Sequence, residues 1–139
     1  PDPKPQTPNP KPQTPISISF INLFPSIVAM SILLETSLGD LTIDLFVQKC
    51  PTACLNFIKL CKLKFYNGIC VTELHKHHVC KLSTTQKRPT TVFEMLGDAE
   101  RKFFKDEIQP DFKIKKKGLV GTANLGPNLN NSDVLSSLT

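Results

Sequence analysis

This 139-residue sequence lacks several patterns that define common classes of protein. It has five cysteines, an odd number, and no Cys-x-x-Cys pair, so a scaffold of disulfides is not expected and a reducing compartment fits better. It also has no glycine-rich loop of the kind that holds nucleotide phosphates. The sequence therefore gives no reason to expect a disulfide-stabilised domain, a bound nucleotide or any other cofactor.

The sequence also lacks an unbroken apolar run of membrane length. Residues 16–34 carry no charge, and about 20 apolar residues suffice to cross a bilayer. However, Pro25 interrupts this stretch, and Asn22 and four serines dilute it. A secretory signal would place a basic start and an apolar run near the N-terminus, where this sequence has proline repeats. We therefore expect no membrane partner.

The first 15 residues repeat the hexapeptide Pro-Lys-Pro-Gln-Thr-Pro, at 3–8 and again at 10–15. This many prolines exclude a helix or a paired strand and predict a disordered or polyproline II arm. Such an arm serves either as a linker or as a ligand for proline-reading domains. We therefore divide the chain into a Pro-rich and apolar extension at 1–29, expected to be disordered, and a globular part at 30–139.

The net charge of +5 and the pI near 9.0 favour weak attraction to acidic partners. Lysine and arginine are scattered, apart from a run made up of Lys113, Lys115, Lys116 and Lys117. No aromatic platform accompanies this run, so we interpret it as a solvated strand end and turn rather than a nucleic-acid interface.

Hydrophobic periodicity predicts a hairpin followed by a helix. Every second residue of 41–45 is apolar, which is typical of a half-buried strand, and 32–36 forms its partner across a turn at 37–40. Pro51 fits the first turn of a helix that should end at about residue 63. Two cysteines on this helix, Cys54 and Cys61, should be buried as small apolar residues. Further on, we expect a short helical or irregular segment at 92–96 and a strand at 118–124.

Two segments carry a resemblance to a known family. Residues 118–132 read GLVGTANLGPNLNNS, and residues 30–68 read MSILLETSLGDLTIDLFVQKCPTACLNFIKLCKLKFYNG. The first segment resembles the proline pocket of the cyclophilins, which are cyclosporin-binding prolyl isomerases. The second resembles the opening hairpin and first helix of the nuclear cyclophilins that also carry an RNA-recognition domain.

The resemblance implies a mainly β fold. Cyclophilins form an eight-stranded antiparallel barrel capped by two helices, and this chain supplies about five strands and one clear helix, at about 51–63. We therefore expect an incomplete cyclophilin-like barrel over 30–139, with open strand edges that favour aggregation unless a partner covers them. The implied location is nuclear or cytoplasmic, and the nuclear choice follows from the resemblance alone.

The resemblance also implies an activity, the cis/trans isomerisation of Xaa-Pro bonds, which needs neither a metal nor covalent chemistry. The implied partners are proline-containing peptides or proteins, with cyclosporin-like ligands if the pocket forms. Three residues match the family segment that contacts the peptide and are the candidate substrate-binding residues, namely Thr122, Ala123 and Asn124.

The family's catalytic arginine has no counterpart here. When the strand after residues 66–68 is laid on the family's Phe-His-Arg strand, Glu73 takes the arginine position, and an ionised carboxylate has no hydrogen bond to donate to a twisting amide. His78 and Lys81 fall near the family's pocket phenylalanine and glutamine, and 133–135 replaces its Gln-Phe-Phe. No catalytic residue is intact in this degenerate middle, so the alternatives to an isomerase are a non-catalytic proline-peptide binder and a non-functional fragment.

The same segment also raises the possibility of a metal site, because five ligand-type residues lie close together, namely Cys70, His75, His77, His78 and Cys80. Their spacing lacks the close pairs of structural zinc motifs, and adjacent side chains on a strand point to opposite faces. A cysteine nucleophile would need an orienting Asp or Asn and an oxyanion loop, and the sequence indicates neither. We therefore expect no metal site and no nucleophilic catalysis.

Overall fold

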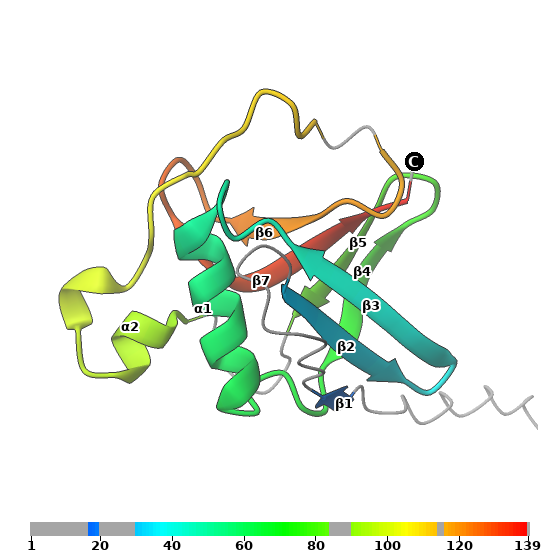
Figure 1. Ribbon diagram of the computed structural model, residues 1–139, viewed down its shortest axis with the longest axis horizontal. Helices are drawn as coiled ribbons and strands as arrows, with labels where there is room; N and C mark the ends of the chain where they lie inside the picture. The colour runs from blue at the N-terminus through cyan, green and yellow to red at the C-terminus, as the bar shows by residue number, and fades with distance from the viewer. Residues whose placement is uncertain (1–16, 20–29, 84–89, 114–115, 139) are drawn as a thin grey trace, which may run out of the picture.

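The computed structural model describes residues 17–19, 30–83, 90–113 and 116–138 (Figure 1). In chain order their elements are β1 (Ser17–Ser19), β2 (Met30–Thr36), β3 (Gly39–Leu45), α1 (Pro51–Lys62), β4 (Cys70–His75), β5 (Val79–Ser83), α2 (Val92–Met95), the 3-10 turn η1 (Ala99–Arg101), β6 (Val120–Asn124) and β7 (Asn130–Ser137). The expected mainly β architecture with one clear helix is confirmed, and the short helix expected near residue 92 is α2.

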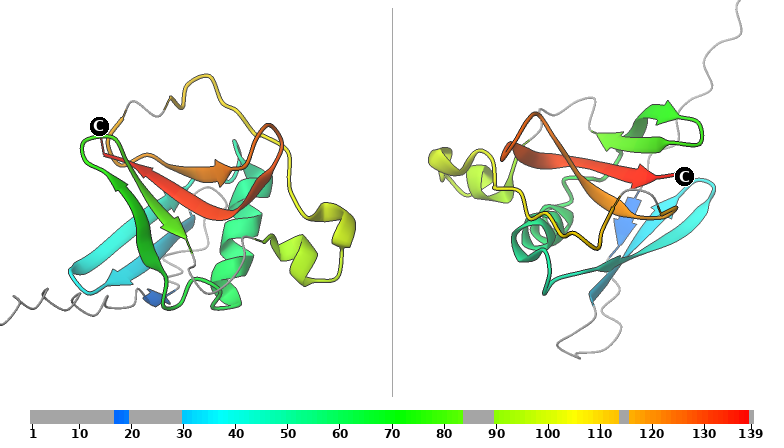
Figure 2. Two further views of the ribbon diagram at one scale, coloured as in Figure 1. Left: turned by 180° about the vertical axis from the view of Figure 1, so that it is seen from behind. Right: turned by 90° about the horizontal axis from the view of Figure 1, so that it is seen from above.

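The strands form two antiparallel sheets, with the orders β1-β2-β3 and β4-β5-β7-β6. The two sheets cross each other, and α1 stands beside both of them, with α2 and η1 on its far side (Figures 1 and 2). The buried apolar cluster joins residues of both sheets, of the two α-helices and of the segment between α1 and β4, namely Ile32, Leu34, Cys54, Ile58, Leu60, Cys61, Phe65, Tyr66, Ile69, Val92 and Val134.

The predicted hairpin is β2 and β3, paired in register from Met30 opposite Leu45 to Thr36 opposite Gly39. Only part of β3 follows the expected alternation, because Ile43 and Leu45 are half-buried whereas Leu41 is exposed. In the described part of the chain β3 is the last strand of its sheet, so no strand pairs with its outer edge.

The extension at 1–29 was expected to be disordered, but one short segment of it forms a strand. Residues 17–19 form β1, which pairs antiparallel with Leu33 to Glu35 of β2. The proline repeats and residues 20–29 lie outside the described residues. A strand-forming piece of the extension thus covers part of the outer edge of β2.

Helix α1 begins at Pro51 as expected and ends at Lys62, within one residue of the prediction. The expected burial of Cys54 and Cys61 is confirmed, since their exposed fractions are 7% and 3%. Burial raises the pKa of the Cys61 thiol to about 12. Among the described helices α1 is the longest at 12 residues, and none has the length and hydrophobicity that a bilayer span requires.

The strand β7 was not among the expected elements. It lies between β5 and β6 and is buried along most of its length, although its first four residues are polar. Part of this stretch finds partners from distant segments: the backbone carbonyls of Asn131 and Ser132 accept from Asn56 and Tyr66, and the carboxylate of Asp133 accepts from Ser83. The sequence alone does not show these partners, which make a polar stretch suitable for a central strand.

Candidate functional site

The candidate substrate-binding residues lie side by side on β6, an edge strand of the four-stranded sheet. Ala123 is buried, Thr122 is partly exposed and Asn124 is exposed. The hydroxyl of Thr122 donates a hydrogen bond to Oδ1 of Asn130, at 3.1 Å, across the β6–β7 turn. Within the described part of the chain the outer edge of β6 is not paired with another strand.

The β6–β7 turn is fastened from outside by Asp106. Its carboxylate accepts from Nδ2 of Asn130 at 2.6 Å and from the backbone N–H of Asn128 at 3.1 Å, while Oδ1 of Asn128 accepts from the backbone N–H of Asp106 at 2.9 Å. The bond from Asn130, followed by that from Asn128, lowers the pKa of the Asp106 carboxyl below its usual value. The turn is therefore held in one geometry even though Asn128 adopts a left-handed backbone with φ of 58°.

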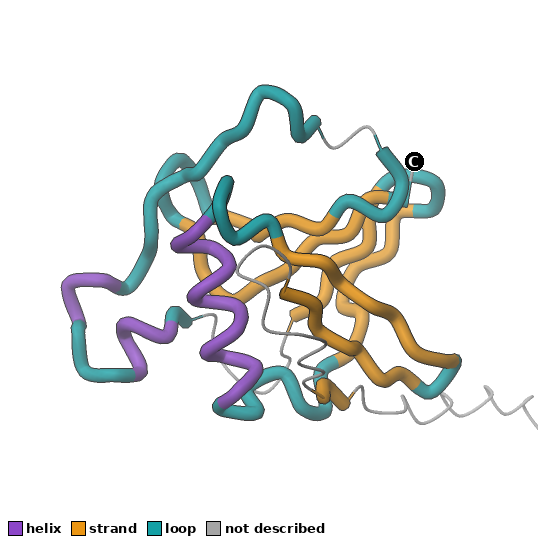
Figure 3. The backbone as a smooth tube through the Cα atoms, in the orientation of Figure 1, coloured by secondary structure: helices purple, strands orange, loops and turns teal. Residues whose placement is uncertain are grey.

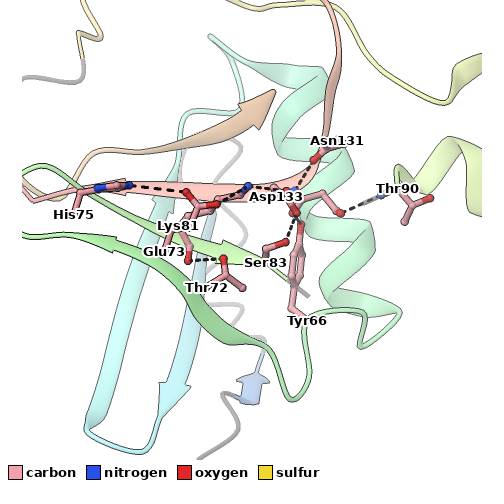
Figure 4. A network of polar contacts seen from close by, with 10 residues as sticks. Tyr66, Thr72, Glu73, His75, Lys81, Ser83, Thr90, Asn131 and Asp133 are labelled. Carbon is pink, nitrogen blue, oxygen red and sulfur yellow. Dashed lines mark hydrogen bonds and ion pairs between the residues drawn. The ribbon is translucent and has the colours of Figure 1, made fainter. Parts of the chain in front are cut away.

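The position predicted for the catalytic arginine holds a carboxylate engaged in a charge network (Figure 4). Glu73 lies on β4, 3.6 Å from Nζ of Lys81 on β5, and Nε2 of His75 is 4.0 Å away on its other side. The same Lys81 ammonium lies 3.4 Å from the carboxylate of Asp133, a side chain that is 7% exposed. Two carboxylates therefore share one ammonium donor here, and neither carboxylate can donate a hydrogen bond to an amide.

A second part of the network anchors the buried end of β7 (Figure 4). The hydroxyl of Tyr66 donates to the carbonyl oxygen of Ser132 at 2.8 Å, and Oγ of Ser132 accepts from the backbone N–H of Thr90 at 3.1 Å. Oγ of Ser83 donates to Asp133 at 2.7 Å. Burial, with smaller contributions from Cys61 and Asp133, raises the pKa of Tyr66 well above its usual value, so the phenol stays protonated and keeps donating.

This combination of fold and site matches a known family. The cyclophilin type peptidyl-prolyl cis-trans isomerase/CLD family matches residues 31–134, from β2 into β7. The chain belongs to this family. The match includes the middle segment, so β4 and β5 belong to the cyclophilin-type domain.

Curated relatives and solved structures agree with this assignment. A peptidyl-prolyl cis-trans isomerase of Arabidopsis thaliana is 40% identical over 112 residues, 78% of this chain and 22% of the relative. The peptidyl-prolyl cis-trans isomerase-like 4 of Homo sapiens is 38% identical over 109 residues, 76% of this chain and 22% of the relative. The chain thus spans about a fifth of the length of these relatives.

Among solved structures, a cyclophilin-type peptidyl-prolyl cis-trans isomerase of Cryptosporidium parvum, crystallised in the presence of the dipeptide Ala-Pro, aligns with a TM-score of 0.68. It is 26% identical, and the alignment covers 78% of this chain and 67% of the other. A second structure of the same protein has a TM-score of 0.64 at 23% identity, and the alignment covers 89% of this chain and 66% of the other. Both support the fold of the cyclophilin-type domain.

The predicted site residues of this cyclophilin-type domain lie in one sheet but do not touch. Glu73 lies on β4 at one edge and Thr122 to Asn124 on β6 at the other, with β5 and β7 between them. Sequence reasoning missed Asp106, Asn130 and Asp133, which hold β6 and β7 in place. The one available sign was the concentration of Asn and Asp around the β6–β7 turn, where such residues are favoured.

The histidine-rich turn of the cyclophilin-type domain does not gather into a ligand set. His75 faces Glu73 at 4.0 Å, and His77 lies in the β4–β5 turn with φ of 61°. Across the described ranges no three His, Cys, Asp or Glu side chains are close enough to hold a metal ion together. Burial raises the pKa of Cys80, so this thiol stays protonated at neutral pH.

Proposed function

We propose that this cyclophilin-type domain binds Xaa-Pro segments at β6, through Thr122, Ala123 and Asn124, with the proline reaching across the sheet toward β4, and that Glu73 on β4 limits its catalysis of cis/trans isomerisation. The open edge of β6 and the exposed Asn124 support the binding half of this proposal. The solved relative crystallised in the presence of Ala-Pro supports the same class of ligand. Larger proline-containing proteins, and cyclosporin-like molecules where the pocket accommodates them, belong to this class.

The catalytic half of the proposal rests on one observation: the carboxylate of Glu73 is paired with the ammonium of Lys81. Isomerisation requires the protein to favour the twisted amide, whose nitrogen gains a lone pair that a fixed donor stabilises. A carboxylate at this position supplies no donor, and the nearest ammonium, that of Lys81, already lies between two carboxylates. A non-catalytic proline-peptide binder is therefore the second candidate, and a non-functional fragment is the third.

The test is exchange NMR on an Ala-Pro peptide with the wild-type chain, Glu73→Arg and Glu100→Arg. Glu100 is an exposed residue of η1, so the last variant is a control with the same change of charge. Glu73→Arg should raise the cis/trans exchange rate at least tenfold, about 1.4 kcal/mol of transition-state stabilisation. A further variant with both Glu73→Arg and Lys81→Gln restores both family positions and removes the repulsion between Arg and Lys81.

The outcomes separate the candidates. The whole proposal is supported if the peptide changes the amide chemical shifts of 122–124 and if the cis/trans exchange rate rises only in the Glu73 variants. Shifts without faster exchange in any variant favour the non-catalytic binder. An absence of shifts in every variant rejects peptide binding along β6, and wild-type exchange as fast as that of Glu73→Arg rejects the limiting role of Glu73.

We also propose that the chain represents the isomerase region of a longer nuclear protein with an RNA-recognition domain. The 22% share of the longer relatives supports this proposal. The uneven resemblance, with a Cryptococcus neoformans relative 76% identical over only 37 residues, supports a degenerate middle. In this layout 1–29 is an extension and 30–139 is the domain, with a degenerate middle. Sequencing the transcript through codons 68–91 and past 139 tests it: an in-frame RNA-recognition domain is expected, and a stop codon without one contradicts it.

A further inference from the structure

A loop segment between η1 and β6, residues 104–112, is fastened to the N-terminal end of α1, and we call it the 104–112 strap (Figure 3). The carboxylate of Glu107 accepts from two backbone N–H groups of α1, and Nε2 of Gln109 donates to the carbonyl oxygen of Lys49 at 2.8 Å. Phe112 stacks on Phe46 with ring centroids 4.5 Å apart. The strap therefore has a fixed place relative to α1, and Asp106 within it has a fixed place relative to the β6–β7 turn.

Asn130 connects the strap to β6; the residue is 4% exposed, and both polar atoms of its side-chain amide form hydrogen bonds. Nδ2 donates to the Asp106 carboxylate at 2.6 Å and to the carbonyl oxygen of Phe104 at 3.1 Å. Both partners are acceptors only, so they fix which end of the amide faces the strap. Oδ1 must then face Thr122, and it accepts the Thr122 hydroxyl proton at 3.1 Å.

This orientation decides what Thr122 offers to a ligand. A hydroxyl has one proton to donate and two lone pairs to accept with. Because the proton of Thr122 is committed to Asn130, the partly exposed oxygen can only accept from outside. If the Asn130 amide turned over, Nδ2 would donate to Thr122, and the hydroxyl would become a donor toward the ligand.

We propose that Asp106 is a positioning residue that fixes the Asn130 amide and thereby makes the Thr122 hydroxyl a hydrogen-bond acceptor. This inference rests on the proposed function of β6 as the strand that binds the peptide. On that basis, β6 selects a peptide with a free N–H beside the proline. The selected group belongs to a neighbouring residue, because proline has no N–H. A peptide whose neighbouring residues are N-methylated cannot supply this bond.

The experiment compares wild type, Asp106→Ala, Asp106→Asn, Thr122→Val and the double variant Asp106→Ala/Thr122→Val. Asp40→Ala, in the β2–β3 hairpin, is a control with the same loss of charge far from the strap. The probes are the capped tetrapeptide Ala-Ala-Pro-Ala and its versions with one N-methylated alanine each. Amide NMR gives both the dissociation constants and the side-chain NH₂ resonances of Asn130 without peptide.

We expect Thr122→Val to weaken tetrapeptide binding about fivefold, the usual net value of one hydrogen bond. Asp106→Ala should weaken it by less, because the carbonyl oxygen of Phe104 still accepts from Nδ2 of Asn130. The double variant should be no weaker than Thr122→Val, because Asp106 acts through Thr122. Asp106→Asn keeps an oxygen that accepts from Asn130 and should restore most of the affinity. At least one N-methylated peptide should bind wild type about fivefold more weakly than the unmethylated tetrapeptide does, and should bind Thr122→Val as tightly as that tetrapeptide does.

Any one of three results would overturn the inference. The Asn130 NH₂ resonances could be unchanged in Asp106→Ala, or Asp106→Ala could reduce peptide affinity equally in the wild-type and Thr122→Val backgrounds. The third is that wild type binds all the probe peptides with equal affinity. If Asp106→Ala does not fold, the affinities of Asp106→Asn and Thr122→Val for the N-methylated peptides test the inference instead. Failure of wild type to bind any probe, together with Asn130 resonances that change in Asp106→Ala, rejects the proposed peptide strand but upholds the fixed amide.

Discussion

Replacing Glu107 by alanine should lower the free energy of unfolding by about 2 kcal/mol, because this side chain supplies the cap of α1. Its two carboxylate oxygens each accept one backbone N–H, those of Thr52 and Ala53, at 3.0 Å. The residue that would normally cap the helix, Cys50, makes no side-chain bond to it, and the first turn of α1 has no acidic residue. Nothing else on the helix therefore compensates the first turn.

The magnitude follows from the kind of bond. A hydrogen bond to a charged group contributes about 1.5 to 3 kcal/mol, and a charge near a helix N-terminus adds about 0.3 to 1 kcal/mol. Glu107 is only half-buried, so solvent screening reduces the sum of two such bonds to about 2 kcal/mol. Glu107→Gln keeps one acceptor oxygen without the charge and should cost about 1 kcal/mol.

Urea unfolding followed by far-ultraviolet circular dichroism measures these differences. Asp111→Ala is the matched control, because it removes a carboxylate of the same strap whose Lys49 partner lies 3.8 Å away with both side chains exposed, a pair that contributes at most about 0.5 kcal/mol. The capping argument is refuted if Glu107→Ala costs no more than Asp111→Ala, or if Glu107→Gln costs as much as Glu107→Ala.

Two further predictions concern buried titratable groups. Tyr66→Phe leaves the buried carbonyl of Ser132 without its donor and should cost about 1 to 2 kcal/mol in urea unfolding; a variant as stable as wild type would contradict the bond. Burial raises the pKa of Cys61 to about 12 and that of Cys54 to about 11, from 9.0 in an exposed thiol. The unfolded thiols lose their protons first, so the free energy of unfolding, measured in urea with a reductant, should fall as pH rises above 9.0; a flat profile for wild type, matching that of a Cys54→Ala/Cys61→Ala variant, would disprove the shift.

The sequence predicted those elements whose cause is local. Alternation of apolar residues and Pro51 were enough for the β2–β3 hairpin and for α1, because both depend on neighbours in the chain. The strand β7 was missed because a run of polar residues does not predict a buried strand, and its partners come from distant segments: Ser83 donates to the carboxylate of Asp133, and Tyr66 donates to the backbone carbonyl of Ser132. A local pattern cannot indicate partners 50 or more residues away.

The same reasoning applies to the candidate site. The assignment of Thr122, Ala123 and Asn124 to one strand needed only a contiguous motif, and β6 contains all three. The position of Glu73 on a strand was also predictable, but its pairing with Lys81 depends on the β4–β5 register, which contains a bulge between Val71 and Glu73. The approach of Asp133 to the same lysine depends on β7, so the shared ammonium was beyond a reading of the sequence.

The central place of β7 has a consequence for how the chain is made on the ribosome. The β4–β5 hairpin leaves the ribosome about 50 residues before the strand that completes its sheet, as the separation of Ser83 and Asp133 shows. At a synthesis rate of about 5 to 20 residues per second, the inner edge of β5 stays uncovered for roughly 3 to 10 seconds. During that interval the nascent chain exposes a strand edge that neighbouring chains can pair with, so slow codons between β5 and β7 lengthen the period in which it can misassemble.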